Sequence, residues 1–176
     1  INSKLWYWCS NYQRLKYKKH DPNNKITKKS YWIRWLWYKD NKTGNNLMKK
    51  KYLIVVADYY QEISKGLLDN ALKLIPKLSS VKIIQVPGVF EIPITISKNI
   101  KRYDAFLALG CVIKGQTPHF DFISSATTNA IMEISIKTKK PIGNGIITCL
   151  NMRQAKARKI KGKEAVRAVN SILSQK

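Results

Sequence analysis

The sequence predicts an α/β domain in which helices cover a four-stranded parallel sheet. Two kinds of segment favour this class. Short apolar runs such as 52–57 are rich in β-branched residues, which is typical of strands buried on both faces. The segments between these runs carry apolar residues at helical spacing. Because strands and helices alternate, we expect right-handed crossovers and a ligand site beyond the carboxyl ends of the strands.

The elements follow one another in a regular order from residue 52 onward. Strands are predicted where apolar residues dominate, at 52–57, 81–86, 105–113 and 142–148. Pro87-Gly88 ends the second of them. Helices are predicted over 61–77, 90–101, 119–138, 151–160 and 163–174. The residues expected to face the sheet from the longer helices are Ile63, Leu67, Leu68, Ala71, Leu72, Ile75, Ile123, Ala126, Ala130, Ile131, Ile134, Val166, Val169, Ile172 and Leu173.

Length and composition argue against several classes of protein. The 176 residues are enough for one domain with a buried core. No apolar run approaches the roughly 18 residues of a membrane span, and the first 20 residues lack the apolar stretch of a secretory signal. We therefore expect a cytoplasmic protein without a membrane partner. Three separated cysteines and two histidines predict neither a disulfide framework nor a metal site.

Residues 1–47 differ sharply from the rest of the chain. They contain all five tryptophans and five of the nine tyrosines, but no Ala, Val, Glu, Phe or Met. They are rich in amino acids that AT-rich codons encode and poor in those whose codons begin with G. We interpret 1–47 as a non-native or disordered basic extension ahead of a start at Met48, and 48–176 as the domain. The alternatives are a genuine disordered segment or a tail that stacks on single-stranded nucleic acid.

Two long motifs lie at the predicted carboxyl ends of strands. They are Val-Pro-Gly-Val-Phe-Glu-Ile-Pro at 86–93 and Gly-Cys-Val-Ile-Lys-Gly-Gln-Thr-Pro-His-Phe-Asp-Phe at 110–122. Together they resemble the signature stretches of the 6,7-dimethyl-8-ribityllumazine synthase family. Asn-Gly-Ile-Ile-Thr at 144–148 and the helix that holds Gln154 and Arg158 fit the same family in order and spacing.

This resemblance covers about residues 51–174 and implies a flavodoxin-like three-layer α/β/α sandwich. It implies a transferase that condenses 5-amino-6-(D-ribitylamino)uracil with 3,4-dihydroxy-2-butanone 4-phosphate. The products are 6,7-dimethyl-8-ribityllumazine, phosphate and water, in the penultimate step of riboflavin biosynthesis. The resemblance also implies that no cofactor is needed, and that pentamers form with active sites between neighbouring subunits. Some members assemble further, into decamers or sixty-subunit shells.

A phosphorylated substrate needs backbone N–H groups and a cation. Gly115, Gln116 and Thr117 join a predicted strand to the start of a helix, where unpaired N–H groups and the helix dipole bind anions. Gly115 would allow close approach of the backbone. Arg158 matches the family's phosphate-binding arginine, and its guanidinium suits bidentate contact. An ordinary strand-to-helix turn and a merely basic helix are the plain alternatives.

His119 directly follows this turn and is the only histidine of the domain. It matches the family's proposed general acid/base, and an imidazole that titrates near neutrality can move protons in both directions. Asp121 could orient His119, but we favour the role of a helix-start acid that stabilises the dipole.

The flat ring and ribityl chain of the other substrate need an aromatic face and polar contacts. Tyr59 stands where the family has a stacking aromatic, and its spacing from the strand favours it over Tyr60. Asn144 matches a residue that the neighbouring subunit contributes, commonly an aromatic. The other residues matched to this substrate are Val89, Phe90, Glu91, Cys111, Val112 and Ile113. Glu91 could also be a helix-start acid, and either tyrosine an ordinary core or rim residue.

Two rival functions remain at this stage. A net charge of +23, of which +9 lies before Met48 and +14 from there onward, invites a basic nucleic-acid-binding protein. Within the domain the lysines fall mostly on predicted solvent-facing helix sides, so no nucleic-acid partner is expected. A non-catalytic flavodoxin-like binding module would not require His119, Arg158 and Glu91 together. Lys161 and Lys163 are both candidates for the family's active-site lysine.

Overall fold

The computed structural model describes residues 49–175. Its strands are β1 (Lys51–Ala57), β2 (Ser80–Val86), β3 (Ala105–Ile113) and β4 (Ile142–Cys149). They form one parallel four-stranded sheet in the order β2-β1-β3-β4, which follows the strand order of flavodoxin-like folds. The predicted α/β class is therefore confirmed. The expected irregular or disordered extension at 1–47 lies outside the described residues.

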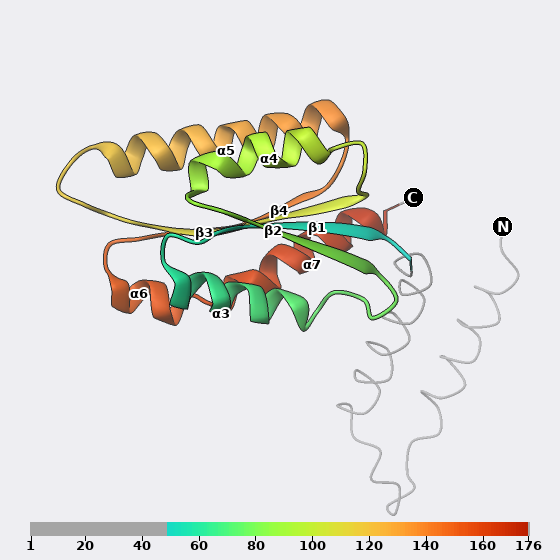
Figure 1. Ribbon diagram of the computed structural model, residues 1–176, viewed down its shortest axis with the longest axis horizontal. Coiled ribbons are helices and arrows are strands. Elements are labelled where there is room, and N and C mark those ends of the chain that lie inside the picture. The colour runs from blue at the N-terminus through green and yellow to red at the C-terminus, as the bar shows by residue number, and fades with distance from the viewer. Residues whose placement is uncertain (1–48, 176) are drawn as a thin grey trace, which may run out of the picture. The chain divides into compact units, whose positions relative to one another are not determined.

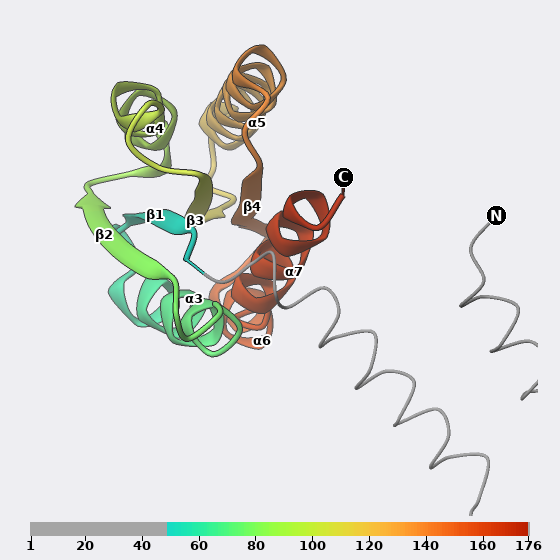
Figure 2. The ribbon, with the colours of Figure 1, turned by 90° about the vertical axis from the view of Figure 1, so that its right-hand side faces the viewer.

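Helices cover both faces of this sheet. They are α3 (Gln61–Leu72), the short 3-10 turn η1 (Val89–Glu91), α4 (Ile92–Asn99), α5 (His119–Thr138), α6 (Met152–Ala157) and α7 (Lys161–Leu173). Figure 1 shows α4 and α5 above the sheet and α3, α6 and α7 below it, and Figure 2 shows the same three layers end on. None of the helices in the described range is long and apolar enough to cross a membrane.

All helices except α5 differ in extent from the sequence prediction: α6 ends three residues early, α7 begins two residues early, and α3 and the helix after β2 differ as follows. The first, α3, ends at Leu72 rather than at residue 77. Pro76 has no backbone N–H and disfavours a helical conformation in the residue before it, so the helix stops one turn early. The predicted helix over 90–101 begins as the 3-10 turn η1 and becomes α-helical only at Ile92.

Three residues that were expected to face the sheet are exposed instead, and these predictions are wrong. Leu72 closes α3 just after the buried Ala71, and Ile172 of α7 stands one position from Leu173, which packs on the core. One residue turns the side chain by about 100° around a helix. On α5 the buried row runs through Thr127 and Ile131, which leaves Ala126 on the exposed side toward α4.

The central strand β1 is buried on both faces. Tyr52, Ile54 and Val56 pack in the core with α3 and α7, while Leu53, Val55 and Ala57 pack in a second core with α4 and α5. The Tyr52 hydroxyl donates to Asn170 Oδ1 at 2.7 Å, and burial raises the pKa of Tyr52 to about 12. By contrast, the edge strand β2 leaves Val81 and Ile83 exposed.

The two helices α3 and α7 touch at backbone level. A Cβ atom at Gly162 would lie 2.0 Å from the Leu67 carbonyl oxygen, so only glycine permits this approach. Gly162 is buried within the first turn of α7. The contact holds the start of α7, and the loop before it, against α3.

We expect Gly162→Ala to destabilise the domain by about 1–3 kcal/mol, because the added methyl group must push two packed helices apart. Thermal unfolding should show a Tm lower by several degrees. Gly115→Ala is the matched control, since a Cβ atom there would meet no atom within 4 Å and its φ is not positive. Equal Tm values for the two variants would contradict the backbone contact.

Candidate active site

The carboxyl ends of all four strands lie at one end of the sheet, on the left in Figure 1. The loops that leave them begin at Asp58, Pro87, Lys114 and Leu150. The chain runs from β1 to β2 on one side and then crosses to β3 on the other, so the strand order reverses between β1 and β3. Ligands of open α/β sheets bind at such a reversal. The predicted motifs therefore surround the place where this fold class forms its sites.

After β1 stand two tyrosines in different environments. Tyr59 is 74% exposed, whereas Tyr60 packs against the core beside α3. Their rings lie edge to face with centroids 4.9 Å apart, and burial is the main cause that raises the pKa of Tyr60. Tyr59 is thus the tyrosine with a face free for a ligand.

A glycine in β3 lets the turn after β2 pack closely against that strand. A Cβ atom at Gly110 would lie 2.7 Å from Val89 Cγ1 and 3.0 Å from Ala57 Cβ. Val89 is buried there, and the next residue, Phe90, is exposed. Glu91 Oε2 accepts a hydrogen bond from the Gly88 N–H at 3.0 Å, so this carboxylate also closes its own turn.

The end of β3 contributes a buried thiol and two half-buried apolar residues. Burial raises the pKa of Cys111 to about 12, with a smaller contribution from Cys149. A thiol with this pKa stays protonated near neutral pH and is no nucleophile. Val112 and Ile113 are half-buried and pair with Thr148 and Cys149 of β4.

The turn from β3 to α5 is open to solvent. Gly115, Gln116 and Thr117 are exposed, and His119 is the first residue of α5. No glycine of the described range has a positive φ, so the backbone conformation does not require a glycine at position 115. A Cβ atom there would also meet no protein atom within 4 Å. Asp121 lies in the first turn of α5, and no hydrogen bond joins it to His119 among the residues described.

Arg158 caps the carboxyl end of α6. Its Nη1 donates to the Thr148 carbonyl oxygen at 3.2 Å, which holds it near the end of β4. The helix start is fixed in turn, since Asn151 Oδ1 accepts from the Gln154 N–H at 3.0 Å and Gln154 Oε1 accepts from the Leu150 N–H at 2.9 Å. The Asn-x-x-Gln spacing is a sequence signal of such a cap, and our sequence analysis did not use it.

Some predicted residues do not come together within one chain. Asn144 pairs with Ala108 in the middle of β4, four residues before Thr148, which corresponds to roughly 13 Å along a strand. Its side chain accepts from the Ile146 N–H at 3.0 Å. In residues 49–175 no hydrogen bond or ion pair joins Arg158 to the turn at 115–117. At the start of α7, Lys161 pairs with Glu164, and Lys163 is half-buried.

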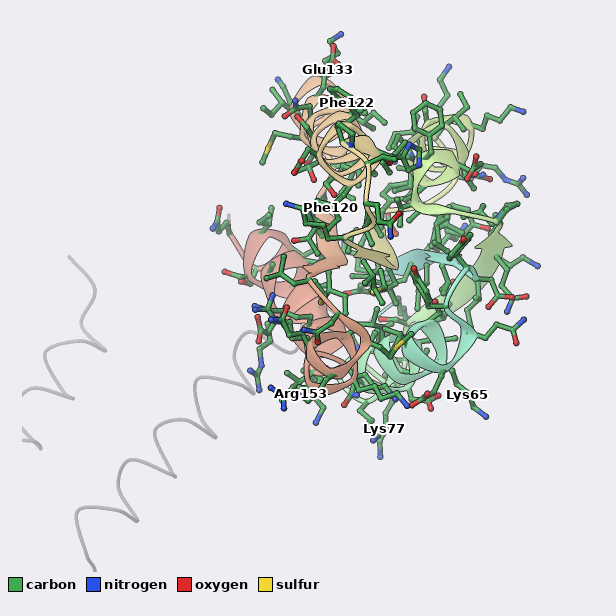
Figure 3. All side chains as sticks on the ribbon, turned by 90° about the vertical axis from the view of Figure 1, so that its left-hand side faces the viewer. Lys65, Lys77, Phe120, Phe122, Glu133 and Arg153 are labelled. Carbon is green, nitrogen blue, oxygen red and sulfur yellow. The ribbon has the colours of Figure 1, made fainter. Side chains whose placement is uncertain are left out.

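An apolar groove of about 400 Å³ runs between α4 and α5. Its lining residues are Phe90, Glu91, Pro93, Ile94, Ala126, Thr127 and Ala130. Phe90 and Glu91 of this lining are among the residues that were matched to the ribityl-bearing substrate. Figure 3 shows Phe122 and Glu133 on α5, and Arg153 and Lys65 on the opposite, α6 and α3, side of the sheet. Within the described range, no group of His, Cys, Asp and Glu side chains is arranged to hold a metal ion.

Comparison with known proteins identifies the family. The family model of 6,7-dimethyl-8-ribityllumazine synthase matches residues 49–176. This chain belongs to that family. The resemblance predicted from the sequence is confirmed, and with it the assignment to a family of transferases of riboflavin biosynthesis. The two rival classes are not favoured.

Individual lumazine synthases align with most of the domain. The chain is 42% identical to that of Bartonella bacilliformis over 117 residues, which are 64% of this chain and 77% of the relative. It is 38% identical to that of an Arthrobacter species over 127 residues, 67% of this chain and 79% of the relative. For Renibacterium salmoninarum the identity is 39% over 105 residues, 58% of this chain and 66% of the relative.

We expect Cys111 and Cys149 to resist alkylation by iodoacetamide in the native protein at about pH 8, because both are buried and the Cys111 thiol stays protonated. Both should react readily after denaturation. Peptide mass spectrometry would measure the labelled fraction at each position. Rapid labelling of native Cys111 would show an accessible, ionised thiol and contradict its burial and raised pKa.

Proposed function

We propose that this chain condenses 5-amino-6-(D-ribitylamino)uracil with 3,4-dihydroxy-2-butanone 4-phosphate to form 6,7-dimethyl-8-ribityllumazine. The observation that carries the proposal is the placement of the two family motifs, at 86–93 and 110–122. Both lie at the carboxyl edge of the sheet, beside the reversal of strand order. The match to the family over 49–176 supports the same activity.

The pyrimidine substrate is assigned to the ends of β1, β2 and β3. Tyr59 offers an exposed ring on which a flat heterocycle can stack. The residues proposed to line its ring pocket and ribityl pocket are Val89, Phe90, Glu91, Cys111, Val112 and Ile113. The Glu91 carboxylate and nearby backbone groups suit the hydroxyls of a ribityl chain, since such groups fix orientation by hydrogen bonds.

The phosphate of the butanone is assigned to the start of α5. Gly115, Gln116 and Thr117 precede a helix of 20 residues, whose dipole and unpaired N–H groups favour an anion. Gly115 has open space around it, so a ligand can approach the backbone there. Arg158 supplies the planar, permanently charged partner that phosphate favours.

His119 is proposed as the general acid/base. The 5-amino group attacks the butanone carbonyl, and loss of water gives an imine. Abstraction of a proton then allows the C–O bond to phosphate to break, and inorganic phosphate leaves with the bonding electrons. Elimination leaves an enol at the neighbouring carbon, and a proton added to its terminal CH2 group converts it into a ketone. The ribitylamino nitrogen closes the ring on this new carbonyl, and a second water is lost. Every step moves protons, and no electron acceptor is consumed, so the reaction needs no redox cofactor. An exposed imidazole beside the phosphate turn can serve these transfers.

A homo-oligomer is part of the proposal, and a pentamer is the form that the family resemblance implies. The turn η1 and the outer faces of α4 and α5 expose large apolar side chains, which a subunit contact would cover. These are Phe90, Ile94, Phe122, Met132 and Ile136. Asn144, far from the site of its own chain, would then serve that of a neighbour. A cytoplasmic location is proposed as well, and the free thiols of Cys111 and Cys149 fit a reducing compartment.

Incubation of the protein with both substrates should generate the absorbance and fluorescence of the lumazine product together with inorganic phosphate. Replacement of His119 by Ala should lower kcat by roughly 10²–10⁴, because a general acid/base is lost, and should leave pyrimidine binding nearly intact. Binding is measured by fluorescence titration and kcat by product absorbance. Absence of product from the unmodified protein would overturn the proposed function, whereas an unchanged single-turnover rate would exclude only His119.

We expect Arg158 to serve the phosphate turn of an adjacent subunit. Arg158→Ala should weaken binding of the butanone phosphate by about ten- to a hundred-fold, the loss typical of a charge-assisted hydrogen bond, and Arg158→Lys should recover only part of it. Mixing Arg158→Ala chains with His119→Ala chains tests the shared site. Recovered activity means that some sites receive both intact residues. If verified subunit exchange recovers none, both residues act within one chain.

A further inference from the structure

A single carboxylate joins α3 to the segment that carries Arg158. Glu62, in the first turn of α3, accepts from Lys156 Nζ at 2.9 Å through Oε2 and from Lys159 Nζ at 2.9 Å through Oε1. Lys156 belongs to α6 and Lys159 follows it, so the two lysines flank Arg158 in the chain. We name these three side chains the Glu62 bridge.

Lys159 is the better-held member of the Glu62 bridge. Its side chain is 27% exposed, against 52% for Lys156. Its aliphatic part lies directly over Gly66 of α3, where a Cβ atom would be 2.4 Å from Lys159 Cδ. Any other residue at position 66 would force this side chain to move. The Gly162 contact holds the other end of the same short segment, so residues 156–162 are fixed to α3 at both ends.

We propose that Glu62 is a positioning residue for the phosphate site. By holding Lys156 and Lys159, it fixes the backbone on both sides of Arg158 and thereby the direction in which the guanidinium is presented. This inference rests on the proposed role of Arg158 as phosphate ligand. It assigns to a residue outside all the family motifs a part in binding the butanone phosphate.

The direction in which phosphate affinity changes when Glu62 is removed distinguishes a positioning role from a purely electrostatic one. Glu62 is anionic and is paired with the lysines on both sides of Arg158, so its charge alone disfavours a phosphate dianion bound by that arginine. If charge were its only contribution, removing it would tighten phosphate binding. If it positions Arg158, removing it weakens binding. The hydrogen bonds from Lys156 and Lys159 lower the pKa of Glu62, so it stays ionised at neutral pH.

The first test measures binding of inorganic phosphate by calorimetry. We expect Glu62→Gln to weaken binding by about three- to ten-fold, which is less than the effect of Arg158→Ala, because exposed ion pairs are individually weak. Asp69→Asn is the matched control. It removes the same charge from the same helix, and Asp69 is exposed without an ion-pair partner among the described residues. Its phosphate affinity should be unchanged or slightly higher.

The second test uses Gly66→Ala, which leaves every charge in place. Alanine favours a helix interior more than glycine does, so Tm should not fall through helix propensity, yet the methyl group displaces Lys159 from Glu62. Phosphate binding should weaken about as much as in Glu62→Gln, and the double variant should be no worse than either single one. In steady-state assays KM for the butanone phosphate should rise, with KM for the pyrimidine unchanged.

Two results would overturn the inference. One is a Glu62→Gln protein that binds phosphate as tightly as Asp69→Asn does, while Arg158→Ala is impaired. The other is a Glu62→Gln protein in which the affinities for both substrates are weakened equally, because such a result indicates general damage to the fold. Failure of the unmodified protein to form lumazine would instead reject the proposed function. Failure of Arg158→Ala to weaken phosphate binding would reject the phosphate role of Arg158 and this inference with it, while the proposed function would stand.

Discussion

Burial of β1 on both faces is the constraint on which the rest of the structure depends. A strand whose side chains are apolar on both sides must be covered twice, and here α3 and α7 supply one cover while α4 and α5 supply the other. Parallel crossovers then place the carboxyl ends of all strands at the same end of the sheet. The strand order β2-β1-β3-β4 reverses between β1 and β3. The position of the candidate site thus follows from the way in which one central strand is buried, before any functional side chain is considered.

Glycines set the finer geometry, because they let backbones approach where a methyl group would not fit. Gly110 admits Val89 onto β3 and thereby places the turn with Phe90 and Glu91. Gly162 brings α7 onto α3, and Gly66 lets Lys159 lie along that helix. The Gly110 and Gly162 contacts hold their segments to the rigid part of the fold by packing, and the Gly66 contact accompanies the ion pair of Lys159 with Glu62. The segments of the candidate site are therefore held in place by packing contacts elsewhere in the fold.

Much of this arrangement could be predicted from the sequence, since strands and long helices leave periodic patterns. The bounds of β3 and α5 agree with those expected, at 105–113 and 119–138. Leu72, Ala126 and Ile172 were placed wrongly because a hydrophobic pattern does not distinguish an apolar residue within the buried row of a helix from one next to that row. The bridge from Glu62 to Lys159 joins residues 97 positions apart. Local sequence patterns do not indicate which distant residue a side chain will pair with. Gly66, inside the α3 pattern, nevertheless indicated that another part of the chain packs closely against this helix.

The open side of β2 has a consequence for how this protein behaves at high concentration. Among the described residues no strand pairs with that side, and Val81 and Ile83 stand exposed on either side of Lys82. Unpaired strand edges with apolar side chains are templates for cross-β aggregation, and an intervening lysine is a common natural safeguard against it. The charge of Lys82 thus opposes edge-to-edge association of two copies, and its loss would leave the exposed apolar side chains of this strand without that protection.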